Sequence, residues 1–470
     1  MDIKNSIVFQ TAGTLSAWEV NNFRKWLHSP FHNARPELSG LFDYLIKCVR
    51  EEVNPHPEPA FNAVFAGQEP DEKKLRHALS WLMTQIRSFF IWQELQSDGN
   101  RRNMYAARSF RKRNLEAGFR QVMREAKTET ALQVPYSAES QLADFYLNFE
   151  QYQWDIDQKR AQDMPFDALS GALTNFYATK LLQLGCTYRA QQALQKQSPQ
   201  TLPGLDLVLS AFPEETFLKE PQTALYYCGY LMLSKPDEHW KEMFRQLLER
   251  HGHRFPVEEA RDLLMMAINY CIRRINQGDR VYLGEVLDFY NLGLQNRLLL
   301  DERGFLRKYT YNNVLLTMAA GKLWERAAEF LETYREQLPP DERDSIYRYN
   351  RAVFLFQKAD YGDAQEILRE LSFSDPIYNL EARRMLLRIY YEENSHDALE
   401  SLLDNLLTWL RRHGEIGYHR EMYRNLARFT GKLLKIPASE REKRLKLAQK
   451  INDTPLVADR QWLLGKVKGA

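Results

Sequence analysis

Apolar residues recur along most of the chain at steps of three and four positions. One clear series is Leu75, Leu79, Leu82, Ile86 and Phe89. This period places the five side chains on one stripe of an α-helix, whereas a half-buried strand would need an apolar residue at every second position. The chain has no sustained alternation of apolar and polar residues and no Asn-Gly hairpin signal. The sequence therefore predicts a nearly all-α fold.

The same period predicts further helices near the start of the chain and after residue 140. Their apolar series are Val20, Phe23 and Leu27; Leu38, Leu41, Leu45 and Val49; and Leu142, Phe145, Phe149, Tyr152 and Ile156. Ser16 and Glu19 have the spacing of a capping box, in which each side chain satisfies a free amide of the first helical turn. Pro30 is predicted to end the first of these helices, and the proline cluster that begins at Pro55 follows the second.

Three copies of one pattern lie between residues 307 and 410. The copies are aligned on Ala327, Ala364 and Ala398, and these anchors lie 37 and 34 positions apart. Other positions of the three copies then match as well. A leucine lies four positions after each anchor, and the first two copies also have an aromatic residue three positions before the anchor and a proline twelve positions after it. These residues are Leu331, Leu368, Leu402, Trp324, Tyr361, Pro339 and Pro376. Each copy is predicted to be a helical hairpin whose small anchor lets the paired helices approach closely.

Looser copies of the pattern precede these repeats. Trp240 and Tyr282 continue the aromatic column at intervals of 42 positions and are predicted to lie in second helices of hairpins. Gly185 is predicted to form the turn of a still earlier hairpin. The predicted organisation is an N-terminal helical cap or bundle at 1–134, a hairpin array at 135–430, and a closing helix and tail at 431–470.

The pattern resembles the tetratricopeptide repeat, a helical hairpin of about 34 residues with an aromatic residue three positions before a small residue of its second helix and a proline at its end. Leu315 and Leu386 depart from the family where its first helix has a small residue, whereas Ala352 keeps that residue. The resemblance implies a right-handed superhelix of stacked hairpins, a tetratricopeptide-like α-solenoid, because each hairpin buries a face against its neighbours. It also implies a concave groove, formed by the first helices, that binds a protein or peptide.

The repeat register singles out three polar positions. Asn313, Asn350 and Arg384 each lie fourteen positions before an anchor, on a predicted first helix. In the family that the pattern resembles, such positions face the groove, and some members use them with two lysines to hold the terminal carboxylate of a peptide. Tyr309 and Leu380 occupy the two lysine positions here, so two cationic donors are missing. The alternative is that the asparagines bond to neighbouring backbone inside the stack.

Charge is nearly balanced over the 470 residues, with 64 Lys and Arg against 62 Asp and Glu. This balance excludes a globally basic protein of the kind that coats nucleic acid or an anionic membrane. Two segments are nevertheless basic: 101–127 has nine basic and two acidic residues, and 432–470 has ten and four. For the second segment, a polar closing helix explains the charge as well as a nucleic-acid tail does.

The first basic segment suggests an alternative function. Aromatic residues interleave with its basic ones, a combination suited to phosphate neutralisation and base stacking. The candidate nucleic-acid face consists of Arg108, Arg111, Lys112, Arg113 and Arg120. The interpretation that we favour is an amphipathic helix with Phe110 and Phe119 inside and with arginines that are solvated or paired with acidic neighbours.

No residue pattern indicates enzymatic chemistry. The sequence lacks the nucleophile elbow, the phosphate loop, the dinucleotide fingerprint and a helical metal-binding histidine pair, so we expect no enzyme, no cofactor and no metal site. The widely spaced Cys48, Cys186, Cys228 and Cys271 are predicted to be buried, reduced thiols. With no leader pattern and no apolar stretch long enough to cross a membrane, we expect a cytoplasmic protein without membrane association. The predicted function is an interaction scaffold, with a nucleic-acid-associated adaptor as the alternative.

Overall fold

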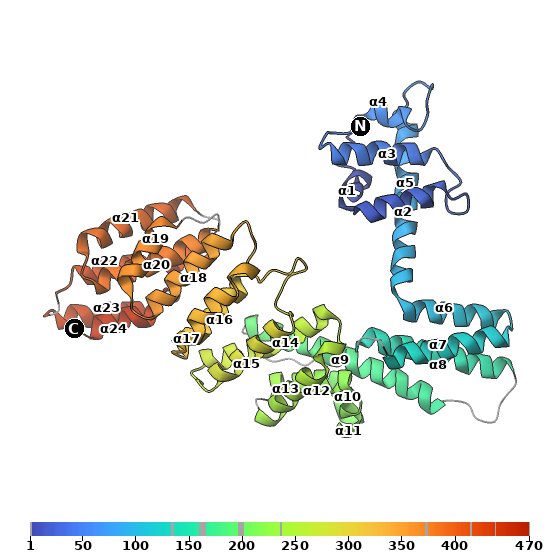
Figure 1. Cartoon of the computed structure of the whole chain (residues 1–470). Coiled ribbons are helices and arrows are strands. Elements are labelled where there is room, and N and C mark those ends of the chain that lie inside the picture. Colours follow the sequence, from blue (N-terminus) through green and yellow to red (C-terminus); the bar gives the residue numbers. More distant parts are fainter. Residues whose placement is uncertain are drawn as a thin grey trace. The chain divides into compact units, whose positions relative to one another are not determined.

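A computed structural model of the chain describes residues 2–132, 136–158, 166–195, 202–235, 237–371, 375–413, 416–437 and 439–469 (Figure 1). The chain divides into two compact units, Met1–Lys180 and Leu181–Ala470. The division falls inside the stretch predicted as the hairpin array. The assignment of cap, array and tail to 1–134, 135–430 and 431–470 stays a prediction.

Every regular element among the described residues is a helix. In the first unit the helices are α1 (Ile7–Thr14), α2 (Ala17–His28), α3 (Leu38–Arg50), α4 (Pro57–Asn62), α5 (Glu72–Ser97), α6 (Gly99–Lys112), α7 (Glu116–Leu132), α8 (Ala138–Asp157) and the first half of α9 (Phe166–Gln195). In the second unit α9 is followed by α10 (Leu205–Ala211), α11 (Glu214–Leu218), α12 (Pro221–Ser234), α13 (Glu238–His251), η1 (Gly252–Arg254), α14 (Val257–Asn276), α15 (Tyr282–Gln295), α16 (Lys308–Ala320), α17 (Trp324–Thr333), η2 (Arg335–Gln337), α18 (Arg343–Gln357), α19 (Tyr361–Glu370), α20 (Pro376–Glu392), α21 (His396–Arg412), α22 (Tyr418–Leu434), α23 (Arg441–Asp453) and α24 (Arg460–Lys468).

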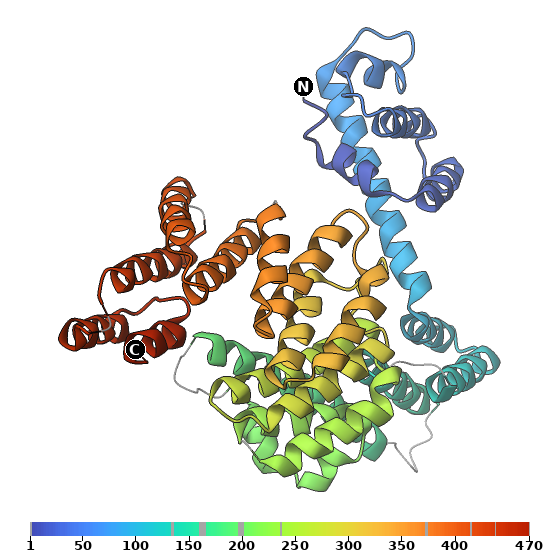
Figure 2. The ribbon, with the colours of Figure 1, turned by 60° about the vertical axis from the view of Figure 1, so that its left-hand side comes forward.

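The prediction of a nearly all-α fold is confirmed. The described residues form no strand, and they contain one isolated β-bridge, between Leu300 and Leu306. Helices that follow one another pack in pairs, among them α6 with α7, α12 with α13, α14 with α15 and α18 with α19 (Figures 1 and 2). None of the described helices has both the length and the apolar composition needed to traverse a lipid bilayer.

Helices α1 to α5 surround an apolar core at the start of the first unit. Phe23 of α2 is fully buried in this core, and its ring centroid lies 4.8 Å from that of Phe42 of α3 and 5.3 Å from that of Phe89 of α5. Such aromatic contacts add to the free energy gained by burying the rings. The buried residues of α5 stop at Phe89, and the rest of this long helix extends beyond the bundle towards α6 (Figure 1).

The predicted helix boundaries in this bundle are confirmed. The Ser16 hydroxyl accepts the Glu19 amide hydrogen, and the Glu19 carboxylate accepts the Ser16 amide hydrogen at 2.8 Å, which is the predicted capping box. Helix α2 ends at His28, just before Pro30, and α3 ends before the proline cluster. These signals work because they act within one helical turn of the residue that carries them.

Helices α6, α7 and α8 form a second apolar cluster. Phe119 of α7 stacks on Trp154 of α8, with ring centroids 4.6 Å apart. The prediction located α8 correctly but gave it the wrong buried face. Its buried residues include Ala143, Leu147, Glu150 and Trp154, whereas Leu142, Phe145, Phe149 and Tyr152 are half-buried and Ile156 is exposed. The buried face follows the contact of α8 with α6, which includes a charged residue that an apolar pattern cannot reveal.

In the second unit, the first helices of the three repeats end in the same turn. After α16, α18 and α20, the residues Lys322, Ala359 and Asn394 have φ of 57°, 63° and 55°, the left-handed region that favours glycine. In each turn the next amide bonds to the carbonyl five residues earlier, at N···O distances of 2.9, 3.0 and 2.8 Å. The turn residues are spaced by 37 and 35 positions, so they define a repeat register without reference to any side chain.

This register corrects the third anchor of the sequence alignment. Ala327 and Ala364 are fully buried at the fourth positions of α17 and α19, as predicted. The fourth position of α21 is Leu399, which is also fully buried, and Ala398 beside it is half-buried. The second period is therefore one position longer than the sequence alignment makes it. An alignment on small residues follows the wrong column here because the third repeat has a leucine at the buried position.

The turn predicted at Gly185 is wrong, although the two hairpins after it are present. Trp240 lies in α13 and Tyr282 begins α15, the second helices of the α12–α13 and α14–α15 pairs. Helix α9, in contrast, continues through Gly185. A Cβ atom at this position would lie 2.7 Å from Leu205 Cδ2 and 3.1 Å from Tyr230 Cδ2. Glycine therefore allows α9 to pack closely against these side chains, and it does not form a turn.

Two further features of the second unit are the burial of α12 and the form of the C-terminal stretch. Helix α12 is buried on all sides, since every residue from Gln222 to Met232 is buried among the neighbouring helices. The C-terminal stretch forms two helices, α23 and α24, where one closing helix and a tail were expected. Leu463 and Leu464 of α24 are buried, and Trp462 Nε1 donates a hydrogen bond to Glu392 Oε1 at 2.8 Å. These contacts fix α24 to the rest of the unit.

Candidate functional site

Two of the three residues predicted for a groove are asparagines with different surroundings. Asn313 lies on α16 and is exposed. Asn350 lies on α18 and is fully buried, and its Nδ2 donates a hydrogen bond to the Ile346 carbonyl at 2.8 Å. Asn350 therefore bonds to neighbouring backbone, as the alternative interpretation predicts, and its side chain is not available to a ligand.

The third predicted residue, Arg384 of α20, is enclosed and already holds carboxylates. Its Nη1 donates to both oxygens of Asp459, at 3.1 and 2.8 Å, and its Nε donates to Glu381 at 2.8 Å. Burial alone would lower the pKa of this guanidinium, but the attraction of Glu381 and Asp459 raises it above its ordinary value. Arg384 thus binds a carboxylate, as the resemblance implies, but the chain itself supplies that group.

The carboxylate belongs to the segment 454–459, which links α23 to α24. Asn425 of α22 donates from Nδ2 to the Leu456 carbonyl at 2.9 Å, and the Ala458 amide donates to the Met422 carbonyl at 3.2 Å. The segment therefore lies against both α20 and α22. With α24 and the neighbouring helices it covers α20, which has no exposed residue along its length.

Asn313, Asn350 and Arg384 also do not form one row. Counted from the left-handed turn residues, Asn313 and Asn350 occupy equivalent positions, but the matching residue of α20 is Met385. Met385 is buried. The displacement follows from the one-residue error in the third anchor, and it separates Arg384 from the two asparagines in the repeat.

A polar cluster that the sequence did not reveal lies at the start of α16. Lys308 Nζ is 3.4 Å from Asp375 Oδ2 and 3.6 Å from Glu342 Oε1, and the Tyr309 hydroxyl donates to Asp375 at 3.1 Å. Asp375 also accepts the Ile377 amide hydrogen as N-cap of α20. The Asp-Pro pair at the start of α20 is therefore the sequence feature that could have pointed to this cluster. The side chain of Tyr309 remains 56% exposed, although its hydroxyl is held.

The candidate nucleic-acid face is partly neutralised by a buried carboxylate. Glu150 of α8 is 1% exposed and accepts hydrogen bonds from Arg108 Nε at 2.7 Å and from Arg111 Nε at 2.8 Å. Arg111 is also 3.3 Å from Asp157. Both arginines therefore support the packing of α6 against α8, as expected if they are paired with acidic neighbours.

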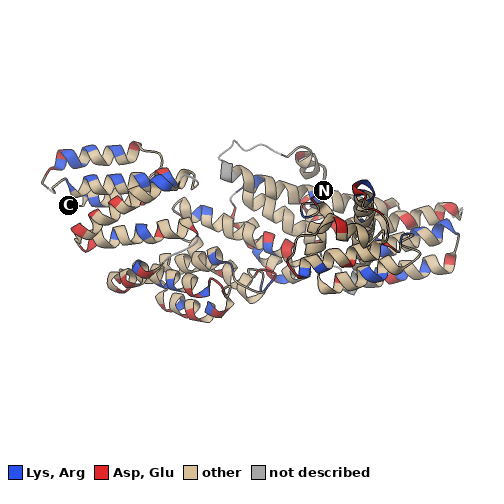
Figure 3. Cartoon of the chain, turned by 90° about the horizontal axis from the view of Figure 1, so that it is seen from above, with Lys and Arg blue, Asp and Glu red and all other residues tan. Residues whose placement is uncertain are grey.

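The other residues of this face are exposed. Arg113 donates to the Ser109 carbonyl at 3.0 Å, Arg120 pairs with Glu116 one turn earlier on α7, and Lys112 ends α6. Figure 3 shows both signs of charge over these helices, whereas basic positions are frequent towards the C-terminal end. Phe119 is buried and Phe110 is half-buried, as the packing interpretation predicts, but that interpretation is wrong in expecting one helix, since Phe110 lies on α6 and Phe119 on α7.

The thiol prediction is confirmed, since all four cysteines are buried and free. Burial raises the pKa of the Cys228 and Cys271 thiols to about 12. In the part of the chain that the structure describes, no group of three or more histidine, cysteine or acidic side chains is arranged to hold a metal ion.

Comparison with known proteins gave no family for this chain. No family model, no curated protein and no solved structure matches it.

Proposed function

We propose that the chain is a non-enzymatic helical-repeat scaffold, in which tetratricopeptide-like hairpins stack into a superhelix and first helices line a groove for a protein or peptide. The observation that carries this proposal is the segment 454–459. The first helix α20 and the later helix α22 hold this irregular segment through a guanidinium, a side-chain amide and a backbone carbonyl. These are the groups that bind extended peptides in many recognition modules. The same kind of surface can therefore hold a partner where the chain does not cover it.

The uncovered part of this surface is on α16. Tyr309, Asn313 and Ala320 are exposed and recur at helical spacing, so they share one face. An exposed tyrosine with a fixed hydroxyl offers a large contact area at little cost in conformational entropy. Asn313 adjoins it with an amide donor and acceptor that suit an extended backbone. We infer that a peptide binds to this face of α16.

Selection of displayed peptides on the full chain tests the groove. We expect the selected peptides to lose at least about tenfold in affinity, as for loss of a hot-spot aromatic residue, when Tyr309→Ala and Asn313→Ala are combined. The matched control combines Arg326→Ala and Glu329→Ala, two exposed residues on the second helix of the same hairpin. Enriched peptides that bind the wild-type and the Tyr309/Asn313 variant equally well would reject the proposed face.

The alternative function is a nucleic-acid-associated adaptor that uses the face of Arg108, Arg111, Lys112, Arg113 and Arg120. The exposure of Lys112, Arg113 and Arg120 favours this function. The ion pairs that Arg108 and Arg111 form with Glu150 argue against it. If the alternative holds, charge reversal of the three exposed residues should weaken oligonucleotide binding about tenfold or more and reduce its salt dependence. The control reverses Lys25, Lys73 and Arg76 in the N-terminal bundle. Unchanged binding in the first variant eliminates the alternative.

A further inference from the structure

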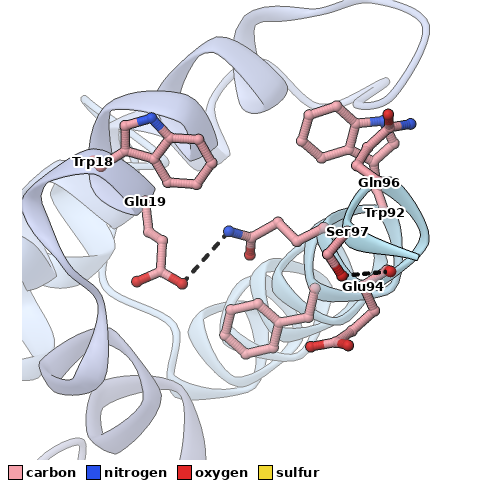
Figure 4. A pocket seen from close by; sticks show the side chains of 8 residues that line it. Trp18, Glu19, Trp92, Glu94, Gln96 and Ser97 are labelled. Atoms are coloured by element: carbon pink, nitrogen blue, oxygen red, sulfur yellow. Dashed lines mark hydrogen bonds between the residues drawn. The ribbon is translucent and has the colours of Figure 1, made fainter. Parts of the chain in front are cut away.

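A pocket of about 760 Å³ lies in the first unit, between the first turn of α2 and the last turns of α5 (Figure 4). Helix α2 contributes Trp18 and Glu19, and α5 contributes Phe90, Trp92, Gln93 and Glu94. Figure 4 shows Trp18 and Trp92 on opposite sides of the opening, with Glu19 on the side of Trp18. The pocket occupies the place where α5 continues beyond its last buried residue, Phe89.

Both tryptophans are more exposed than is usual for so large an apolar side chain. Trp18 is 62% and Trp92 39% exposed. The Trp92 ring is nevertheless held, because it stacks on Phe89 with centroids 6.0 Å apart at an interplanar angle of 21°. A preorganised aromatic wall left open to solvent is characteristic of a binding site.

The polar lining of the pocket is negative. Glu19 accepts hydrogen bonds from Ser16, and its second oxygen lies 3.5 Å from Gln93 Nε2. The bond from the Ser16 amide holds the pKa of Glu19 below its ordinary value, so this carboxylate is charged at neutral pH. Glu94 adds a second carboxylate, and the last turn of α5 presents the negative end of its helix dipole. Among the described residues that line the pocket there is no lysine or arginine.

We propose that this pocket binds the guanidinium of an arginine side chain presented by a partner protein. Aromatic faces attract cations, and a planar guanidinium can stack on an indole while it donates hydrogen bonds at its edge. A compact ammonium is more strongly hydrated, and a methylated ammonium has fewer hydrogen-bond donors or none. The amide and carboxylate acceptors that line the pocket therefore select the guanidinium.

The N-terminal bundle already contains one such contact. The guanidinium carbon of Arg35 lies 3.4 Å from the centre of the Trp81 ring, and Arg35 Nη1 is 3.9 Å from Glu37. Arginine is thus held here by an indole face together with a carboxylate. The pocket at Trp18 and Trp92 is lined by the same two kinds of group, and its described lining includes no arginine.

Fluorine NMR of the full chain, labelled with 5-fluorotryptophan, tests the inference. The resonances of Trp18 and Trp92 are identified from Trp18→Phe and Trp92→Phe chains. The probe is a short Gly-Ser peptide with one central arginine, and matched peptides carry citrulline, lysine or trimethyllysine instead. We expect the arginine peptide to shift these two resonances saturably and to bind at least about tenfold more tightly than the citrulline peptide.

Variants separate the aromatic contribution from the charge. We expect Trp18→Ala to weaken binding of the arginine peptide about fivefold and Glu94→Gln about twofold, because cation–π and exposed charge contacts are of these sizes. Ile91→Ala, an equally exposed change on α5 outside the lining, should leave the affinity unchanged. Equal binding of the arginine and citrulline peptides, stronger binding of the trimethyllysine peptide, or unchanged affinity in Trp18→Ala would each overturn the assignment. The site does not depend on α16, so either proposal can fail without the other.

Discussion

Replacing Glu150 with alanine is expected to destabilise the α6–α8 helices by about 2–4 kcal/mol, as when one partner of a buried ion pair is removed. Glu150 is 1% exposed and holds both Arg108 and Arg111. Without it, Arg111, which is 15% exposed, keeps only the longer contact to Asp157. The cost arises because a guanidinium taken out of water loses its charged hydrogen-bond acceptor.

Amide hydrogen exchange of α6 and α8 measures this loss directly, because it reports the free energy of opening for each helix. Glu150→Gln should lose less stability than Glu150→Ala, since the amide keeps one oxygen acceptor. Glu125→Ala is the matched control, since Glu125 is exposed on α7 and bonds only to Gln121 in the contacts observed. A loss below about 0.5 kcal/mol in Glu150→Ala, the range of ordinary surface changes, would contradict a structural role for the arginine pair.

Asp459→Asn is expected to loosen the contact of α24 with α20 by about 2–3 kcal/mol, because it removes the charge that Arg384 holds through two hydrogen bonds. Asp459 has a φ of 48°, a conformation that asparagine tolerates as well as aspartate does. The substitution therefore removes the ion pair without adding backbone strain. Arg384 keeps Glu381, so the loss is smaller than for a wholly unpaired buried charge.

Hydrogen exchange in 458–467 is the measurement for this second variant. Faster exchange should be confined to α24 and the neighbouring part of α20, while α14 and α15 keep the wild-type rates. Asp453→Asn, at the exposed end of α23, provides a control with the same chemical change. If the two variants exchange alike, the Asp459 carboxylate does not secure this segment.

Local signals in the sequence predict the secondary structure well. The capping box at Ser16 and the stop before Pro30 depend on neighbours within one turn, so one stretch of sequence contains all the information. The sequence predicts the register of the hairpins less accurately. The most regular feature of this register is a left-handed turn at Lys322, Ala359 and Asn394. Because three different residue types adopt this conformation, a sequence alignment cannot recognise the turn from a shared residue.

The candidate sites depended on contacts that no local pattern contains. Arg384 is 75 residues from Asp459, and Arg108 is 42 residues from Glu150. A basic residue looks the same in the sequence whether it is solvated or paired with a distant carboxylate. The pocket at Trp18 and Trp92 escaped prediction for a related reason, since apolar residues on a helix are expected to be buried, and here α5 extends beyond the core that would cover them.

Burial of α12 on every side has a consequence for the synthesis of the protein. As the chain leaves the ribosome, this apolar helix appears before α13 and α14, which later cover it. About 40 residues separate the end of α12 from the end of α14, and at roughly 5–20 residues per second their translation takes about 2–8 s. During those seconds the nascent chain exposes the side of α12 that α13 and α14 later cover, so this is the interval in which a chaperone protects it or aggregation begins.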